Sequence, residues 1–487
     1  MIKYCVSILA KNILEAYEKV QKIYNIADYI EIRADKFKDF DFNIFKKEFN
    51  LEKFIFTIRT PKNGGFFSGS EKQRIELLKY AIANNFGYVD IEYDLSPGII
   101  NWFSENKNKT KIIISYHNFN ETSNNLDNIC KKIIKQKPDI IKIVTKANYL
   151  SDNVKIFELL KKYRKNYKVV FHAMGEYGEI SRIIGGISGN YFTYTSIEQE
   201  LTAPGQLSIE KLKNEYKLDR LRRNFKLYGL LGNPIKHSHG YLIHNFAFNK
   251  NIINSLYLNF LENDLNSFFK NYIDLINGLS VTIPFKKDVI NYLDKIDPKA
   301  KLIGSVNTIL KKNGKLIGYN TDYIGFYNSL KKYINPYSKR IAILGAGGSA
   351  RAVLVSLLDK QNDIKIFNRT VRNAKTLAQE FNCSYGDLSE VYEYNPQILI
   401  NCTSVGMYPK VGDTPINTSK IRNCVVYDLV YNPYYTQFLK LARKHNIIVS
   451  GFDMFLRQAQ EQFRLFTNIN FSYLKYKNYF LKLLKIK

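Results

Sequence analysis

The sequence lacks any run of about 18 to 20 uninterrupted apolar residues, so it predicts no membrane span. Its first ten residues are too few, and too soon followed by charge, for a signal peptide. Cysteine is also scarce, and the five cysteines show neither a CxxC pair nor a spacing suited to zinc. We therefore expect a cytoplasmic protein with incidental or structural thiols and no metal site.

Acidic residues are few. The sequence contains 44 Asp and Glu and 72 Lys and Arg, which gives a net charge of +28. The excess is +10 over residues 1–225 and +18 over the rest, so it is spread through both halves. No zinc finger, basic zipper or interleaved aromatic and basic RNA motif accompanies it. A positive field also suits small anionic substrates. We expect such substrates as partners, with no membrane and no nucleic acid; nucleic-acid binding stays open as the alternative.

Residues 1 to about 205 alternate short apolar segments with amphipathic segments of helix length. Eight apolar segments are predicted strands: Tyr4–Leu9, Tyr29–Arg33, Phe54–Arg59, Tyr88–Glu92, Lys111–Tyr116, Ile140–Val144, Lys168–Phe171 and Tyr191–Tyr194. Eight strands interleaved with helices predict a parallel (β/α)8 TIM barrel. The charged stretch Ser208–Asn224 is expected to supply the last helix and a connector, which places this domain at residues 1–218.

Two further alternations of strand-like and helix-like segments follow the predicted barrel. One runs from Leu227 to about Leu330, and the other begins at the strand Arg340–Leu344. They predict a two-domain α/β dehydrogenase, with a substrate-binding domain at residues 225–330 and a Rossmann domain at 331–450. Helices at 451–487 are expected to return to the substrate-binding domain. The last 26 residues contain no Asp or Glu, so a membrane-surface helix is the alternative to a docked one.

Polar residues stand at or just beyond the C-terminal ends of the predicted barrel strands, which is the face where such barrels build active sites. Lys142 lies within the apolar run Ile140–Val144, and a lysine there is costly unless it faces a functional interior. Nearby arginines would lower its pKa and yield the neutral amine that an imine requires. A strand-end lysine that reaches water is the alternative. His117 could exchange protons near neutral pH.

These residues, in order and spacing, resemble type I 3-dehydroquinate dehydratase over about residues 1–210. The matching segments are Ile30–Asp35, Thr57–Thr60, Ser115–Phe119, Ile141–Ile143 and Thr202–Gln206. The resemblance implies that Lys142 forms an imine with the ring ketone, and that His117 removes the adjacent proton and then helps water leave. It also implies the substrate-binding residues: Arg182, Thr202 and Gln206 at the carboxylate, Glu31 and Arg59 at the ring hydroxyls, and Arg33, with Asp35 fixing the arginines.

One position of this segment departs from the family. Where the family has a glutamate that orients the catalytic histidine, this sequence has Asn63. An asparagine can accept a hydrogen bond but contributes no charge. The tuning of His117 is therefore expected to differ from that in the family.

A glycine-rich turn follows the strand Arg340–Leu344 and precedes the helical stretch Arg351–Leu358. It reads Gly345-Ala346-Gly347-Gly348-Ser349-Ala350 and fits the GxGxxG/A pattern in the strand–turn–helix context that dinucleotide binding requires. The next strand ends in Asn368-Arg369-Thr370, where an NAD enzyme would show an acid. An arginine there favours the 2′-phosphate of NADP. A solvent-facing arginine is the alternative.

Upstream of this turn, one lysine and one aspartate stand among short polar groups. Lys286 follows Ser280–Phe285, Asn307 follows Gly304–Val306, and Asp322 follows Gly318–Thr321. Such a set could bind a polyhydroxylated ring, with Lys286 and Asp322 coupled as a proton relay. A surface ion pair is the alternative, but it explains neither the glycines nor the asparagines.

These blocks, with Gly229–Ser238, Asn401–Met407, Asp428–Pro433 and Met454–Ala459, resemble shikimate dehydrogenase over about residues 226–470. The resemblance implies that Lys286 and Asp322 are the catalytic pair. It implies that the substrate is bound by Ser238, Thr282, Asn307, Tyr431 and Gln458. It implies that the cofactor is bound by Gly345, Ala346, Gly347, Gly348, Ser349, Ala350, Asn368, Arg369, Thr370 and Arg372. The family's second carboxylate-binding serine falls at Gly240, and its second phosphate-binding arginine falls at Asn373, where Arg372 could act instead.

Together the resemblances predict a bifunctional enzyme of aromatic amino acid biosynthesis. It would dehydrate 3-dehydroquinate to 3-dehydroshikimate through a Lys142 Schiff base, and then reduce 3-dehydroshikimate to shikimate with NADPH. Two alternatives stay open. One is a quinate/shikimate dehydrogenase that works oxidatively with NAD(P), and the other is a basic binding protein on a degenerate enzyme scaffold. The sequence makes no prediction of the oligomeric state.

Overall fold

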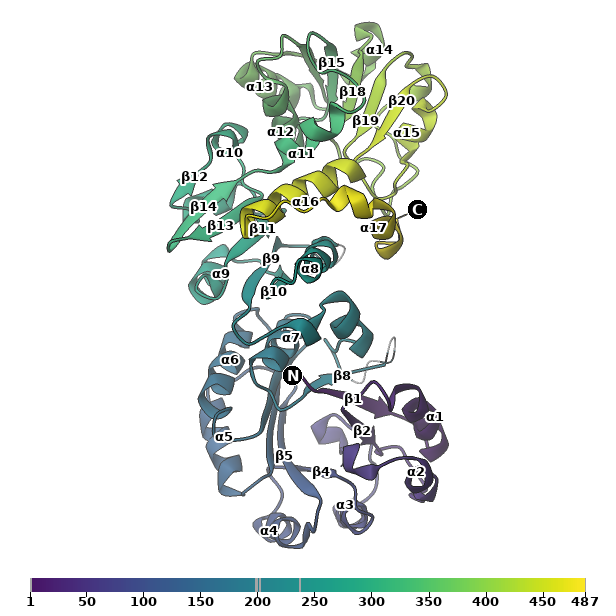
Figure 1. Ribbon diagram of the computed structural model, residues 1–487, viewed down its shortest axis with the longest axis vertical. Coiled ribbons are helices and arrows are strands. Elements are labelled where there is room, and N and C mark those ends of the chain that lie inside the picture. Colours follow the sequence, from purple (N-terminus) through teal and green to yellow (C-terminus); the bar gives the residue numbers. More distant parts are fainter. Residues whose placement is uncertain (1, 198–199, 201–202, 236–237, 487) are drawn as a thin grey trace. The chain divides into compact units, whose positions relative to one another are not determined.

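The computed structural model describes residues 2–197, 200, 203–235 and 238–486 (Figure 1). The chain forms two compact units. The first comprises Met1–Lys226 with Ile252–Leu256 and Asn266–Asp274, and the second comprises Leu227–Asn251, Tyr257–Leu265 and Leu275–Lys487.

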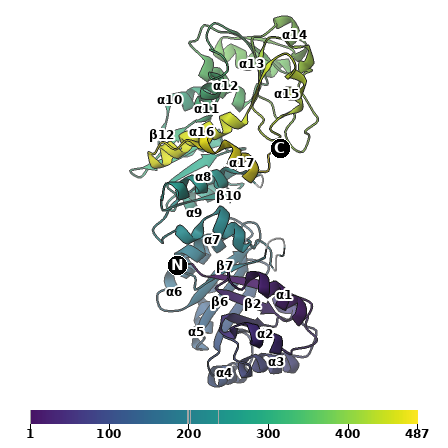
Figure 2. The ribbon, with the colours of Figure 1, turned by 45° about the vertical axis from the view of Figure 1, so that its right-hand side comes forward.

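In the first unit the described residues form an eight-stranded parallel sheet that is rolled into a nearly closed barrel, with strand order β7-β6-β5-β4-β3-β2-β1-β8. The strands are β1 (Tyr4–Leu9), β2 (Tyr29–Arg33), β3 (Phe54–Thr57), β4 (Tyr88–Glu92), β5 (Lys111–Asn118), β6 (Ile140–Lys146), β7 (Val169–Met174) and β8 (Thr193–Thr195). Seven helices cover the outside of this barrel, as Figure 2 shows: α1 (Ile13–Ile23), α2 (Asn43–Glu48), α3 (Glu71–Ala83), α4 (Pro97–Asn106), α5 (Leu126–Lys135), α6 (Asp152–Tyr163) and α7 (Glu179–Ser188).

The barrel helices bury one face because their apolar residues recur at helical spacing. In α5, for example, the buried residues are Leu126, Ile129, Cys130 and Ile133, which all fall on one side of the helix. Inside the barrel, a layer of side chains that includes Ile55, Ile113 and Val170 fills the end opposite the polar residues. The predicted barrel is confirmed.

Three details of this prediction are corrected by the structure. Strands β5, β6 and β7 continue two or three residues past their predicted C-terminal ends, and His117 and His172 in these extensions face the cavity inside the barrel. Strand β3 ends at Thr57, because the Arg59 N–H donates to the carboxylate of Asp35 and not to a neighbouring strand. The expected last helix is only a π-helical turn at Lys211–Glu215 and a 3-10 turn at Leu218–Arg220, separated by Lys217 with φ of 56°.

The second unit contains a mixed sheet and a parallel sheet. In its described residues the mixed sheet has the order β10-β9-β11-β13-β14-β12, from β9 (Lys226–Gly232), β10 (Ser255–Leu261), β11 (Gly278–Val281), β12 (Lys295–Ile296), β13 (Thr308–Lys312) and β14 (Lys315–Tyr319). The associated helices of this unit are α8 (Gly240–Lys250), α10 (Pro298–Ile303) and α11 (Asp322–Leu330). Helix α9 (Leu265–Tyr272) belongs to the first unit except for its first residue.

The parallel sheet has the order β17-β16-β15-β18-β19-β20, which is that of a Rossmann fold. Its strands are β15 (Arg340–Leu344), β16 (Asp363–Phe367), β17 (Ser384–Gly386), β18 (Ile398–Asn401), β19 (Val425–Asp428) and β20 (Ile447–Ser450). Its helices are α12 (Gly348–Leu357), α13 (Val371–Phe381), α14 (Val391–Tyr394) and α15 (Gln437–Ala442). The predicted Rossmann fold is confirmed.

Two helices close the chain, α16 (Phe452–Thr467) and α17 (Lys477–Leu483). Helix α17 packs on α8 through Phe480, whose ring lies 5.2 Å from that of Phe246. Across the described ranges, no helix is both long and apolar enough to cross a membrane.

Candidate active sites

Lys142 lies on β6 with its side chain inside the barrel, and only 5% of the residue is exposed. Its Nζ donates hydrogen bonds to Asp90 Oδ2 at 2.9 Å, to the Tyr194 hydroxyl at 2.9 Å and to Glu31 Oε1 at 3.3 Å. The arginines expected near this amine, Arg33, Arg59 and Arg182, line the same cavity. The charged groups in direct contact with the amine are two carboxylates, which hold it by hydrogen bonds.

Buried arginines hold these carboxylates in place. Arg59 forms ion pairs with Asp90 at 2.5 Å and with Glu92 at 2.7 Å, and Arg74 pairs with Glu92 at 2.6 Å. Burial alone would raise the pKa of Asp90, but Arg59 and Lys142 hold that pKa below its usual value. The carboxylate of Asp90 is therefore ionised beside the amine.

Asp35 fixes the two arginines, as expected from the sequence. Its carboxylate pairs with the Arg33 guanidinium at 2.5 Å and accepts the backbone N–H of Arg59 at 2.9 Å. Both arginine side chains line the cavity that also contains Lys142.

His117 lies near the end of β5, and its ring is parallel to that of Phe119 at 6.0 Å. Its Nδ1 is buried and has no hydrogen-bond partner within the described part of the chain. Asn63 donates a hydrogen bond to Thr60 Oγ1 at 3.4 Å. Burial, together with the charges of Arg59, Lys142 and Arg33, lowers the pKa of His117 well below its usual value. His117 is therefore a neutral imidazole that can accept a proton.

Arg182, on α7, is 1% exposed, and none of the ion pairs found among the described residues involves it. Its Nε is buried without a hydrogen-bond partner there, and burial lowers its pKa to about 10. Gln206 donates to the Thr195 carbonyl at 2.8 Å and accepts from the Ala203 N–H at 3.2 Å. Thr202 lies outside the described residues. An unpaired buried guanidinium suits a carboxylate ligand.

One cavity of about 140 Å³ gathers seven of the eight residues that the resemblance implied for the barrel. They are Glu31, Arg33, Arg59, His117, Lys142, Arg182 and Gln206. The structure adds Tyr194 and His172, which the sequence analysis missed. His172 faces the same cavity because His117, Val144 and His172 are in register across β5, β6 and β7. Its strand had been predicted to end at Phe171, one residue too early to include it.

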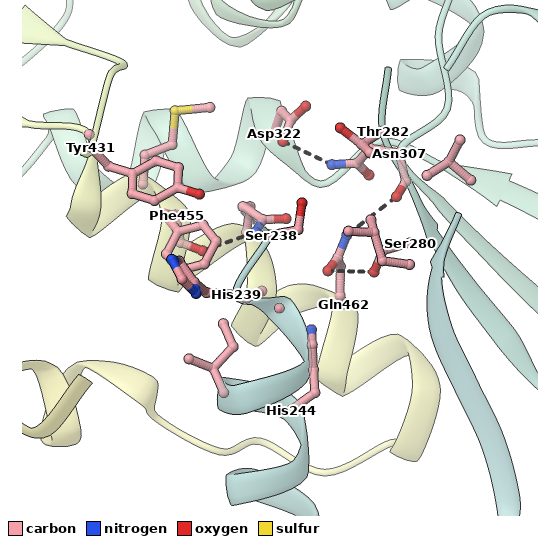
Figure 3. A pocket seen from close by; sticks show the side chains of 18 of the residues that line it. Ser238, His239, His244, Ser280, Thr282, Asn307, Asp322, Tyr431, Phe455 and Gln462 are labelled. Atoms are coloured by element: carbon pink, nitrogen blue, oxygen red, sulfur yellow. Dashed lines mark hydrogen bonds between the residues drawn. The ribbon is translucent and has the colours of Figure 1, made fainter. Parts of the chain in front are cut away.

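In the second unit, Lys286 and Asp322 form an ion pair, with Lys286 Nζ 2.8 Å from Asp322 Oδ2. Asp322 is the first residue of α11, and Lys286 follows the end of β11. Asn307 donates to the other carboxylate oxygen of Asp322 at 2.9 Å, so the aspartate is held from both sides (Figure 3). The pair is only partly buried and can meet a ligand.

A cavity of about 260 Å³ contains this pair (Figure 3). It is lined by all seven residues that the resemblance implied for catalysis and substrate binding: Ser238, Thr282, Lys286, Asn307, Asp322, Tyr431 and Gln458. Ser349, from the glycine-rich turn, lines it too. The glycine-rich turn therefore reaches this cavity.

Side chains from α16 and a neighbouring loop complete the lining. Tyr431 stacks on Phe455 with ring centroids 4.6 Å apart, and Gln458 accepts from the Thr321 hydroxyl at 3.3 Å. Gln462, which the sequence did not indicate, accepts a 3.0 Å hydrogen bond from Ser280, one of the short polar groups named from the sequence. Gln462 follows Gln458 by four residues on α16, which places both on one helix face.

The glycine-rich turn has the geometry of a dinucleotide site. Gly345 has φ of 102°, which favours glycine, and an added Cβ would lie 2.9 Å from Thr403 Cγ2. At Gly347 and Gly348 an added Cβ would meet nothing within 4 Å, so the backbone at the start of α12 is open to a ligand. Positive helix ends and exposed N–H groups favour phosphate binding.

Two arginines follow β16 at the expected position of the 2′-phosphate. Arg369 and Arg372 are exposed, and neither takes part in an ion pair within the described ranges. Asn368 donates to the Thr370 carbonyl at 2.9 Å and fixes the turn between them. Asn373 is also exposed but brings no charge. These residues fit a dinucleotide that carries an additional phosphate.

The barrel with its buried lysine, followed by a Rossmann dehydrogenase, defines a two-part α/β enzyme. Family models agree: type I 3-dehydroquinase matches residues 4–223, the shikimate dehydrogenase substrate binding domain matches residues 230–309, and shikimate / quinate 5-dehydrogenase matches residues 329–410. The bifunctional 3-dehydroquinate dehydratase/shikimate dehydrogenase of Arabidopsis thaliana, named chloroplastic, is 34% identical over 496 residues, with 96% of this chain and 82% of that protein covered.

The shikimate biosynthesis protein AroDE of Chlamydia pneumoniae is 30% identical over 470 residues, with 95% of this chain and 94% of that protein covered. A crystal structure of a shikimate dehydrogenase in complex with NADP+ is 37% identical, with a TM-score of 0.51 over 54% of this chain and 97% of that one. This chain belongs to the family of bifunctional 3-dehydroquinate dehydratase/shikimate dehydrogenases.

Proposed function

We propose that this chain catalyses two consecutive steps of the shikimate pathway, from 3-dehydroquinate through 3-dehydroshikimate to shikimate. The observation that carries the proposal is that two separate cavities each gather a complete set of reacting groups, Lys142 with His117 and Lys286 with Asp322. We assign the dehydratase to residues 1–218, the substrate-binding domain to 225–330, the NADP-binding domain to 331–450 and the returning helices to 451–487.

In the dehydratase, Lys142 Nζ attacks the ring ketone of 3-dehydroquinate, and the ketone oxygen leaves as water when the Schiff base forms. Asp90, Glu31 and Tyr194 all present oxygens within 3.3 Å of the amine, so hydrogen bonds hold it in place for the attack. His117, as a neutral imidazole, takes the proton from the adjacent carbon and returns it to the hydroxyl that leaves. Water then hydrolyses the imine and releases 3-dehydroshikimate.

Arg182 supports this assignment because it is a buried cation without a counter-ion in the described structure. The carboxylate of 3-dehydroquinate would supply that counter-ion and thereby fix one end of the ring. Glu31 and Arg59 would meet the ring hydroxyls.

In the dehydrogenase, bound NADPH supplies the hydride that reduces the ketone carbon of 3-dehydroshikimate. Lys286 donates a proton to the oxygen as negative charge develops on it, and Asp322 orients the ammonium. Ser238, Thr282, Asn307, Tyr431 and Gln458 hold the ring. The turn Gly345–Ala350 receives the pyrophosphate, and Asn368, Arg369, Thr370 and Arg372 receive the 2′-phosphate. We place the enzyme in the cytoplasm, since all five cysteines are unpaired, which suits a reducing compartment.

The test is to incubate the purified chain with 3-dehydroquinate and NADPH and to identify every product. Shikimate formation, with 3-dehydroshikimate as the intermediate, establishes both activities. Accumulation of 3-dehydroshikimate alone would remove the reductase from the proposal, and an unchanged substrate would remove the dehydratase. Parallel incubations of quinate with NADP+ or NAD+ test the oxidative alternative. Retention on nucleic acid over a range of salt concentrations tests the binding alternative.

A further inference from the structure

Gly240, the first residue of α8, lines the reductase cavity at the position where the resemblance implies a carboxylate-binding serine. A Cβ added there would lie 3.5 Å from the Tyr257 hydroxyl and 3.7 and 3.8 Å from two carbons of the same ring. These are ordinary van der Waals distances, and no closer atom was found. A serine would fit at this position, so the glycine leaves a serine-sized space directly beside the phenol of Tyr257.

Tyr257 is held rigidly at this place. It is 1% exposed, on β10, and its ring stacks on His244 with centroids 4.5 Å apart. The side chain of Asn245 accepts the backbone N–H of Tyr257 and donates to its carbonyl, both at 2.9 Å. Tyr473, in turn, hydrogen-bonds His244 at 3.1 Å. Because the phenol is already ordered, its contact with a ligand would cost little conformational entropy.

The surroundings of the phenol favour an anion. Helix α8 begins at Gly240, so its positive end faces the cavity, and Ser238 lines the cavity beside it. Among the described residues that line the cavity, the only acidic one is Asp322, which is paired with Lys286. Burial raises the pKa of Tyr257, opposed by a hydrogen bond with Ser280, so the phenol keeps its proton at neutral pH and can donate it.

We propose that the Tyr257 hydroxyl binds the carboxylate of 3-dehydroshikimate in place of the hydroxyl that Gly240 lacks. Tyr257 is then a substrate-binding residue of the reductase, and the missing serine is replaced from a different element of the fold. This inference rests on the proposed reductase function, which is measured first. A wild-type protein that does not reduce 3-dehydroshikimate with NADPH refutes that function, whatever the Tyr257 variants do.

The experiment compares Tyr257→Phe, Gly240→Ser, Gly240→Ser/Tyr257→Phe and Gly240→Ala/Tyr257→Phe. A hydrogen bond to a charged group changes binding by roughly ten- to a hundredfold. Tyr257→Phe is therefore expected to raise KM for 3-dehydroshikimate by about tenfold or more, with a smaller effect on kcat. KM for NADPH should stay the same. In Gly240→Ser/Tyr257→Phe, KM for 3-dehydroshikimate should return to within about threefold of the wild-type value. In Gly240→Ala/Tyr257→Phe it should not.

The comparison of serine with alanine at position 240 separates the effect of the serine hydroxyl on KM from the effect of the added volume. Equal recovery with serine and alanine, or recovery with neither, assigns the effect of Tyr257→Phe to packing and overturns the proposal. An unchanged KM in Tyr257→Phe overturns it directly. Gly240→Ser in the wild-type background gives an answer even where Tyr257→Phe folds poorly. With Tyr257 already donating, the added serine should lower KM by less than about threefold, whereas a decrease of about tenfold or more would show that the position had no donor.

Discussion

Lys142 donates a hydrogen bond to the Tyr194 hydroxyl at 2.9 Å, and that hydroxyl donates in turn to Glu31 at 3.1 Å. The phenol thus connects the amine to a carboxylate that also contacts it directly, at 3.3 Å. Three side chains from β6, β8 and β2 meet at one point inside the barrel. Hydrogen bonds on two sides therefore fix the amine at the point where the imine would form.

The amine of Lys142 should be trapped covalently. Borohydride added with 3-dehydroquinate should label Lys142, and Lys142→Met should abolish dehydration while NADPH-dependent reduction of 3-dehydroshikimate persists, because distant sites do not usually couple. Peptide mapping locates the label. Lys146→Met is the matched control, because Lys146 ends the same strand but is exposed. A label on another lysine would show that the imine forms elsewhere.

The pH profile of the dehydratase should respond to Asn63. His117 acts as a base only while it is neutral, and its lowered pKa keeps it neutral to low pH. Asn63→Glu adds an opposite charge in the same cavity, so it should raise the pKa of His117 by about one unit or more. The acidic limb of kcat/KM should then move to higher pH. Asn63→Gln, which adds no charge, should leave that limb in place, and a shift of similar size with glutamine would contradict the electrostatic explanation.

Arg369 should set the preference for NADPH over NADH. A charge-assisted contact with the 2′-phosphate is worth about ten- to a hundredfold in binding, so Arg369→Ala should remove most of the preference in kcat/KM. Arg372→Ala serves as the comparison, because both arginines are exposed and close in sequence. If Arg369→Ala keeps the full preference and Arg372→Ala loses it, the phosphate is bound by Arg372.

Lys286 and Asp322 should act as one unit. Lys286→Ala and Asp322→Asn should each lower kcat by about 10²- to 10⁴-fold, the usual value of a positioned acid or base. The double variant should be far less impaired than the product of the two effects, because each change already disables the pair. Lys287→Ala is the control, since Lys287 is adjacent and exposed. Strictly multiplicative losses would indicate independent roles, and a near-normal kcat in either single variant would refute the mechanism.

Much of the barrel could be predicted from the sequence because its strands are apolar and its helices amphipathic. The prediction was least accurate where polar residues enter an interior cavity, since His117 and His172 look like the end of a strand in a sequence. Asp90 and Tyr194 were missed for a related reason. Which side chains meet Lys142 depends on how strands distant in sequence are placed around the barrel, and the pattern within one strand does not identify those neighbours. The roles assigned to individual site residues stay predictions for the experiments above.

The isolated guanidinium of Arg182 has a consequence for the lifetime of the protein. A buried charge without a counter-ion lowers the stability of the empty barrel, and a bound carboxylate removes that cost. A ligand that binds only the native state raises stability in proportion to the logarithm of its concentration. The barrel should therefore melt at a higher temperature, and resist proteolysis longer, as the concentration of its own substrate rises. In a cell, an interruption of the substrate supply should therefore increase the rate at which the protein itself is degraded.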